Sequence, residues 1–263
     1  MGVYHKDNSE FFCQAMDSIL NQTKKSNDIV LVIDGPIYDE LLDNVKEYIS
    51  KYPEIHPIWL PKNIGQGRAF QQALPECLNE IVFRMDSDDI SVPTRFEKQL
   101  NYLIKHPEVK VLSSTISEFI DNVENIVTIK KVPERNDEII RFSHRWNPIN
   151  QPSAVFYKSV IISVGSYQDF YRYEDYYLWV RVLDAGYIAA NIQESLLFYR
   201  LSSENIKRRT NWQTIKSAIK FYRWKHKIKF TNWFYTYYMI IVMLCIFITP
   251  DFIFEQVYKY IRK

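Results

Sequence analysis

Three carboxylates lie close together in the chain, at Asp86, Asp88 and Asp89. They follow the mostly apolar residues 81–85, which predict a short buried strand. Acids this close repel one another unless a positive charge lies between them. A divalent cation with oxygen ligands, carrying substrate phosphates, meets that need. A solvated acidic turn or a helix cap ahead of Pro93 is the alternative, because proline suits the first turn of a helix.

Further acids stand at positions where chemistry could use them. Glu174 and Asp175 open a predicted helix that ends at Gly186. Adjacent acids raise each other's pKa toward the range of a working general base, although acids also simply favour helix N-termini. Asp34 follows a second buried strand at 29–33 and is either a ligand-binding acid or a turn residue.

Strand and helix patterns alternate along the first half of the chain. This order predicts an α/β fold with a mostly parallel mixed central sheet flanked by helices. Ligands of such sheets gather at the carboxyl ends of the strands. With no internal repeat or linker, residues 1–200 are expected to form one domain. The expected helices cover 9–20, 41–49, 68–78, 93–105 and 174–185, and the expected strands 29–33, 55–60, 81–85, 109–113, 123–132, 154–157 and 196–200.

The remaining residues, 201–263, predict a basic and apolar helical region. Residues 200–230 hold ten Lys and Arg against the single acid Glu204, and residues 230–250 carry no charge. An uncharged stretch of this length could cross a bilayer, but a proline interrupts it and an amphipathic stretch at 252–261 follows. Flanking basic residues and crowded aromatics favour docking in the headgroup interface. A single span, or an ordinary docking helix or dimer contact, is the alternative.

Composition narrows the class and the compartment. Hydrophobic residues make up 47% and charged residues 24%, which excludes a disordered chain. The three cysteines and five histidines show no metal-ligand spacing, and no signal peptide is apparent. We therefore expect a cytoplasmic protein whose basic segment meets an anionic membrane surface or an acidic partner, with no role for nucleic acid.

A series of short motifs extends over residues 1–200. In this order they resemble the GT-A domain of family 2 glycosyltransferases, in the bacterial branch that builds capsular, exopolysaccharide or O-antigen sugars. The motifs are Ser18-Ile19-Leu20-Asn21-Gln22-Thr23, Ile33-Asp34-Gly35-Pro36, Asn63-Ile64-Gly65, Arg84-Met85-Asp86-Ser87-Asp88-Asp89, Pro93-Thr94-Arg95-Phe96, Asn147-Pro148-Ile149-Asn150 and Glu174-Asp175-Tyr176-Tyr177-Leu178-Trp179-Val180-Arg181.

The resemblance implies a nucleotide-sugar donor, with a UDP-sugar favoured. Tyr4 matches the family position that stacks on the base, and Asp34 matches the acid that accepts from the imide N–H of the base. Asp86 and Asp88 match the Asp-x-Asp motif that holds Mn²⁺ or Mg²⁺ against the diphosphate. Asp89 is the third acid of this expected donor and metal site. The metal would neutralise the leaving diphosphate.

The resemblance also implies an inverting displacement. Asp175 is the expected general base, which takes the proton of the acceptor hydroxyl as that oxygen attacks the anomeric carbon. Glu174 is expected to support it rather than react. Arg68 could add a positive contact to the donor or be a solvated helix residue. Trp179 could line the acceptor pocket or only pack.

Three departures from the family pattern bear on this expectation. The first strand is reduced to the residues before Tyr4, so we expect the nucleotide pocket to lose part of its floor. A catalytically inert nucleotide-sugar-binding protein is therefore the alternative function. Gln151, beside Asn150 on the expected acceptor side, stands where relatives commonly have histidine. The Gln-x-x-Arg-Trp signature of processive synthases is absent, which predicts one sugar per acceptor.

Other acid-bearing sites fit the sequence less well. A haloacid-dehalogenase phosphatase needs Thr or Val after its acidic motif, where this chain has Asp89-Ile90. A calcium loop needs a central glycine, and Gly65-Gln66-Gly67 lacks the third glycine of a dinucleotide-binding turn. The resemblance thus implies a metal-dependent, non-processive glycosyltransferase. Its acceptor would be a polysaccharide or lipid-linked oligosaccharide at the cytoplasmic membrane face.

Overall fold

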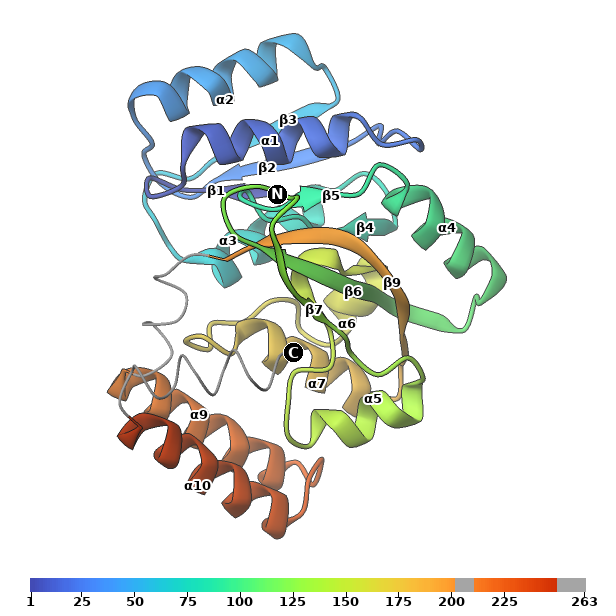
Figure 1. Ribbon diagram of the computed structural model, residues 1–263, viewed down its shortest axis with the longest axis vertical. Coiled ribbons are helices and arrows are strands. Elements are labelled where there is room, and N and C mark those ends of the chain that lie inside the picture. The colour runs from blue at the N-terminus through green and yellow to red at the C-terminus, as the bar shows by residue number, and fades with distance from the viewer. Residues whose placement is uncertain (202–210, 250–263) are drawn as a thin grey trace.

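The computed structural model describes residues 1–201 and 211–249, which form an α/β fold with two sheets (Figure 1). The first sheet is parallel, with strand order β1-β2-β3. Its strands and the helices between them are β1 (Gly2–Val3), α1 (Ser9–Leu20), β2 (Ile29–Ile33), α2 (Asp39–Lys51) and β3 (Ile55–Trp59). The predicted strands and helices of this part are confirmed to within a few residues.

The short strand β1 pairs in parallel with β2. Gly2 pairs with Val32, and the N-terminal amino group of Met1 donates to the carbonyl of Val30 at 2.9 Å. This pairing carries Tyr4 to the carboxyl end of β2, where Asp34 lies. The amino end of β2 lies away from these two residues.

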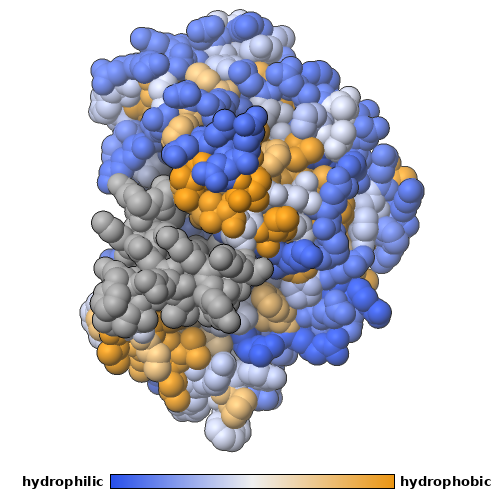
Figure 2. Space-filling view, viewed as in Figure 1, coloured by the Kyte–Doolittle hydropathy of each residue, from blue (hydrophilic) through white to orange (hydrophobic). Residues whose placement is uncertain are grey.

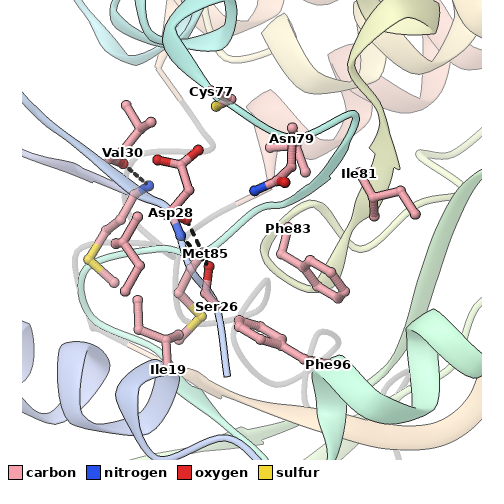
Figure 3. A pocket seen from close by; sticks show the side chains of 13 residues that line it. Ile19, Ser26, Asp28, Val30, Cys77, Asn79, Ile81, Phe83, Met85 and Phe96 are labelled. Atoms are coloured by element: carbon pink, nitrogen blue, oxygen red, sulfur yellow. Dashed lines mark hydrogen bonds between the residues drawn. The ribbon is translucent and has the colours of Figure 1, made fainter. Parts of the chain in front are cut away.

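A cavity of about 100 Å³ lies at this end of β2, between β2 and β4 (Ile81–Phe83). Figure 3 shows Val30 and Asp28 on one side of it and Ile81 and Phe83 on the other. Cys77 also lines it. The cavity lies away from the carboxyl end of β2, which carries Asp34, and the expected loss of floor in the nucleotide pocket stays a prediction.

The second sheet has the strand order β4-β8-β6-β9-β5, with β7 paired to β6. Only the β6–β9 pair is parallel, so the expectation of a mostly parallel central sheet is wrong for this half. Residues 120–125 join β6 to β7, and this connection is too short for the crossover that a parallel pair needs. Strand β4 is an edge strand and only half-buried. The other strands are β5 (Ile90–Ser91), β6 (Val109–Phe119), β7 (Ile126–Lys130), β8 (Val155–Tyr157) and β9 (Ile188–Arg200).

Further helices cover the sheets, and α7 (Glu174–Asp184) confirms the predicted helix at 174–185. It buries Leu178, Val180 and Val182 in the core. The others are α3 (Gln66–Ala73), η1 (Leu74–Glu76), α4 (Arg95–Lys105), α5 (Asn136–Ser143), η2 (Gln151–Ser153), α6 (Lys158–Ser163), α9 (Trp212–Lys227) and α10 (Trp233–Ile248).

Helices α9 and α10 lie side by side at one end of the molecule (Figure 1). Helix α9 packs against α7, with the rings of Phe221 and Tyr176 4.6 Å apart. Helix α10 leaves aromatic side chains such as Trp233 exposed, and Figure 2 shows apolar surface at this end. Within residues 1–201 and 211–249, no helix has the length and apolar character needed to cross a membrane. The amphipathic stretch expected at 252–261 lies outside the described residues.

Candidate functional site

The turn after β4 carries the acidic motif. The guanidinium of buried Arg84 donates to Asp86 Oδ1 at 2.5 Å and lies over the ring of Phe70 at 4.5 Å. Burial, followed by the neighbouring charge of Asp86, raises the pKa of Asp88 to about 7. Buried Arg200 also contacts this turn, yet the charge of Asp86 still raises the pKa of Asp88, so the negative charge is only partly offset. The turn is suited to a further cation.

Asp89 lies behind this turn. It is fully buried, and its Oδ1 accepts from the backbone N–H of Arg200 in β9 at 2.9 Å. The Nε of Arg200 donates to the carbonyl of Asp88 at 2.9 Å. Asp89 therefore joins the acidic turn to the second sheet. Its Oδ2 has no hydrogen-bond partner in the part of the chain that the structure describes, and the metal contacts of Asp86, Asp88 and Asp89 stay predictions.

Asp7 belongs to this site, although the sequence analysis did not single it out. Its Oδ2 accepts from the backbone N–H of Tyr4 at 3.1 Å and from Ser87 Oγ at 2.8 Å. Burial raises the pKa of Asp7 to about 6, against these two hydrogen bonds. Asp7 thereby ties the loop of Tyr4 to the acidic turn. The only sequence signal was an acid three positions after Tyr4.

Asp34 holds the loop that leads into α3. Its two carboxylate oxygens accept from the backbone N–H groups of Ile64 at 2.7 Å and Gly65 at 3.0 Å. The next residue, Gly35, has φ of +88°, and a Cβ there would lie 2.4 Å from the backbone nitrogen of Asn63. Only glycine fits this turn. Asp34 is thus a turn residue, which is one of the two roles that the sequence allows. Its expected contact with the base of the nucleotide stays a prediction.

A groove of about 300 Å³ lies between the start of α3 and the start of α7. Arg68 lines it and forms an ion pair with Asp169 at 2.9 Å, with both side chains more than half exposed. Glu174 lines the opposite side, and Gln66 Nε2 donates to Asp86 Oδ1 at 3.2 Å. Glu174 is thus the α7 acid that lines the groove, and Gln66, which also lines it, contacts the acidic turn at Asp86.

The two acids at the start of α7 are in different surroundings. Asp175 Oδ2 accepts from Asn147 Nδ2 at 2.8 Å, and its Oδ1 accepts from the N–H of Tyr176 at 2.6 Å. Burial raises the pKa of Asp175, while these bonds and the charge of Lys130 act against the rise. Burial and then the charge of Asp175 raise the pKa of Glu174 to about 7. The sequence motif contained Asn147 but gave it no role.

The residues expected on the acceptor side are largely enclosed. Trp179 is 1% exposed and packs on Phe156, with ring centroids 6.1 Å apart. Of its two possible roles, lining the acceptor pocket or only packing, this arrangement fits packing. Asn150 is also buried, and its Nδ2 donates to the carbonyl of Ser114 at 2.9 Å. Neither side chain is open to an acceptor in this structure. Gln151 is half-buried.

No group of three His, Cys, Asp or Glu side chains in the described ranges is placed to hold a metal ion. Asp86 and Asp88 supply two carboxylates, and the oxygens of a bound diphosphate would complete the set. Mg²⁺ is commonly held in this way, by one or two carboxylates together with substrate phosphates. The side chains present therefore fit a cation that binds together with the donor.

Comparison with known proteins gives consistent matches. A model of glycosyl transferase family 2 matches residues 3–165. The amylovoran biosynthesis glycosyltransferase AmsE of Erwinia amylovora is 36% identical over 235 residues, which are 88% of this chain and 86% of that protein. The UDP-Gal:alpha-D-GlcNAc-diphosphoundecaprenol beta-1,3-galactosyltransferase of Escherichia coli is 38% identical over 227 residues, which are 85% and 82% of the two chains.

Two solved structures share the fold. A mannosyltransferase from Pyrobaculum calidifontis, in complex with GDP-Man and Mn²⁺, has a TM-score of 0.64 over 84% of this chain, with 15% identity. S. aureus TarS 1–349 in complex with UDP-GlcNAc also has a TM-score of 0.64 over 84% of this chain, with 14% identity. The matches cover 63% and 64% of those two chains, which is less than two thirds of their length. At this identity they show the GT-A fold alone.

Proposed function

From the premise that the chain belongs to glycosyltransferase family 2 and uses a nucleotide-sugar donor, we propose a divalent-cation-dependent, inverting, non-processive reaction with Asp175 as general base. The observation that carries this proposal is the groove between α3 and α7. Glu174, at the start of α7, lines this groove, and Gln66 on its other side donates to Asp86 of the acidic turn. A donor held at the acidic turn would place its sugar toward α7.

The donor end of the site is built by the first sheet and the acidic turn. Tyr4 would stack on the base, and Asp7 fixes the Tyr4 loop relative to Ser87. Asp86 and Asp88 would hold Mn²⁺ or Mg²⁺, which when bound supplies positive charge to the leaving diphosphate. Arg68, at the groove, could add a further positive contact once its exposed pairing with Asp169 is exchanged.

The reacting proton belongs to the acceptor hydroxyl. Asp175 would take it as the hydroxyl oxygen forms its bond to the anomeric carbon and the bond to the diphosphate oxygen breaks. Burial keeps the pKa of Asp175 above its ordinary value, so its carboxylate is a stronger base than an exposed aspartate. The bond from Asn147 Nδ2 occupies Oδ2 and orients the carboxylate.

The relatives support a choice of substrates to test. The Escherichia coli relative is named for transfer from UDP-Gal to GlcNAc-diphosphoundecaprenol. We take UDP-galactose and a GlcNAc-diphosphoryl lipid as the first pair to test. A lipid-linked acceptor lies in a membrane. The exposed aromatic side chains of α10 would dock the protein peripherally on the cytoplasmic face of that membrane.

The experiment measures UDP release and product formation from UDP-galactose, other UDP-sugars and GDP-mannose with Mn²⁺ and this acceptor. Asp88→Ala should remove the metal-dependent activity, and Asp175→Asn should lower kcat by about 10²–10⁴. Asp184→Asn, at the other end of α7, is the matched control and should be active. Activity retained in Asp175→Asn would refute the assignment of the base. Donor binding without turnover in the wild-type chain would instead identify the inert binder.

A further inference from the structure

A lysine of α9 is buried against the catalytic half of the molecule. The side chain of Lys225 is fully buried, and its Nζ lies within hydrogen-bond distance of three oxygens. These are the carbonyl of Ser143 at 3.0 Å, the carbonyl of His144 at 3.0 Å and the hydroxyl of Tyr176 at 3.1 Å. An ammonium has three donors, so all three have acceptors.

Three aromatic rings surround the same nitrogen. The centroids of Tyr176, Phe221 and Tyr222 lie 4.8, 5.0 and 4.5 Å from Lys225 Nζ. Burial lowers the pKa of Lys225 to about 6, while ring faces and oxygen acceptors favour the charged amine. The charged amine donates to all three oxygens at once. Its position therefore fixes the segments that carry them.

The partners of Lys225 belong to the two segments that make the Asp175 contact. The carbonyls at 143 and 144 end α5, and the same stretch continues to Asn147, which donates to Asp175. Tyr176 is the next residue after Asp175, and its hydroxyl also donates to the end of α5 at 2.6 Å. Tyr222, one turn before Lys225 in α9, donates from its hydroxyl to the carbonyl at 145 at 2.7 Å.

We propose that Lys225 is a positioning residue for the reaction. It holds the segment 143–147 against the start of α7, so that Asn147 meets and orients the carboxylate of Asp175. The inference rests on the proposed role of Asp175 as general base. It makes α9 a part of the catalytic unit, in addition to any part that α9 and α10 have at a membrane.

The test compares Lys225→Met, which keeps an unbranched side chain but removes the donors, with the wild-type chain. UDP-galactose turnover is measured with Mn²⁺ and the GlcNAc-diphosphoryl lipid, and binding of UDP with Mn²⁺ is measured separately. We expect kcat to fall about ten- to a hundredfold, since small displacements of reacting groups have effects of this size. The affinity for UDP should change less than about twofold. Lys105→Met, on the exposed last turn of α4, should match the wild-type chain.

A double-mutant cycle separates positioning from stability. If Lys225 acts through Asn147, adding Lys225→Met to Asn147→Ala should lower kcat less than it does alone. Tyr222→Phe, which removes one hydroxyl, gives a milder variant should Lys225→Met fail to fold, and its kcat should fall severalfold. If the two substitutions lower kcat by independent factors that multiply, the inference is overturned. It is also overturned if the folded variants keep the wild-type kcat. Activity retained in Asp175→Asn would refute the proposed base, whereas an inactive Asp175→Asn with fully active Lys225→Met would refute only the positioning role.

Discussion

The Asn147 amide affects both the orientation and the charge of Asp175. Its hydrogen bond favours the ionised carboxylate, so Asn147→Ala should raise the pKa of Asp175 further. A base with a higher pKa needs a higher pH to be free of its proton. The acidic limb of the kcat profile should therefore move to higher pH, and kcat at neutral pH should fall about tenfold. Steady-state rates between pH 5 and 9 measure this.

The control for that profile is Asn101→Ala, an exposed residue of α4. Its profile should overlay the wild-type profile. An unchanged acidic limb in Asn147→Ala would mean that this amide does not act on the titrating group.

Glu174 predicts how stability depends on pH. Burial and the charge of Asp175 raise its pKa from the ordinary 4.5 to about 7 in the folded chain. The unfolded chain thus loses this proton first, and the contribution of Glu174 to stability, full below pH 4.5, is lost as pH rises through 7. In EDTA, the fall in Tm between pH 5 and pH 8 should be smaller for Glu174→Gln than for the wild-type chain. Exposed Glu47→Gln is the control, and equal falls in all three would contradict the prediction.

Candidate site residues could be predicted from the sequence more readily than the residues that hydrogen-bond to them. Asp88 and Asp175 were predicted because each lies in a local motif. Asp7 was missed because its partner Ser87 is 80 positions away. Asn147 lies 28 positions from Asp175, so its hydrogen bond depends on how α5 and α7 pack. The buried Lys225 was hidden in a strongly basic segment.

At the scale of elements, the start of α1 connects helix stability to the donor end of the site. Asn8 caps α1 by accepting from the N–H of Phe11 at 3.0 Å, directly after Asp7. Asn8→Ala should destabilise the protein by about 1 kcal/mol, and Asn8→Ser, which keeps a capping oxygen, should restore most of it. Urea unfolding measures both. A loss in Asn8→Ser equal to that in Asn8→Ala would show that the cap is not the cause.

Apolar patterns located most elements but missed parts of the longest strands. The strand expected at 109–113 continues to Phe119, because polar Ser113 and Ser117 are buried with partners in β9. Ser113 Oγ donates to Asn191, and the hydroxyls of Ser117 and Ser195 lie 2.7 Å apart. Such hydroxyl pairs let polar residues occupy a buried strand. Pairing direction, in turn, depends on which strands meet in space, and a local pattern does not contain that.

At the scale of the whole molecule, the surface of α10 predicts membrane binding. Trp233 and Phe234 are 65% and 57% exposed, and the neighbouring α9 carries exposed lysines. We expect the chain to sediment with phosphatidylglycerol vesicles and less with phosphatidylcholine, because basic residues add about 1 kcal/mol each near an anionic surface. The double variant Trp233→Ser, Phe234→Ser should bind at least about tenfold more weakly. Trp59→Ser, exposed on β3, is the control.

Two results would contradict that prediction. One is equal sedimentation of the α10 double variant and the wild-type chain. The other is binding to anionic vesicles that does not weaken with salt, since screening reduces the attraction of exposed charges.

The cavity between β2 and β4 has a consequence for the response of the protein to hydrostatic pressure. A cavity of about 100 Å³ per molecule corresponds to on the order of 60 mL/mol, which is within the range of volume changes that let pressure unfold proteins. Compression would therefore act first where the two sheets meet at the amino end of β2. We therefore expect high hydrostatic pressure to destabilise the folded chain.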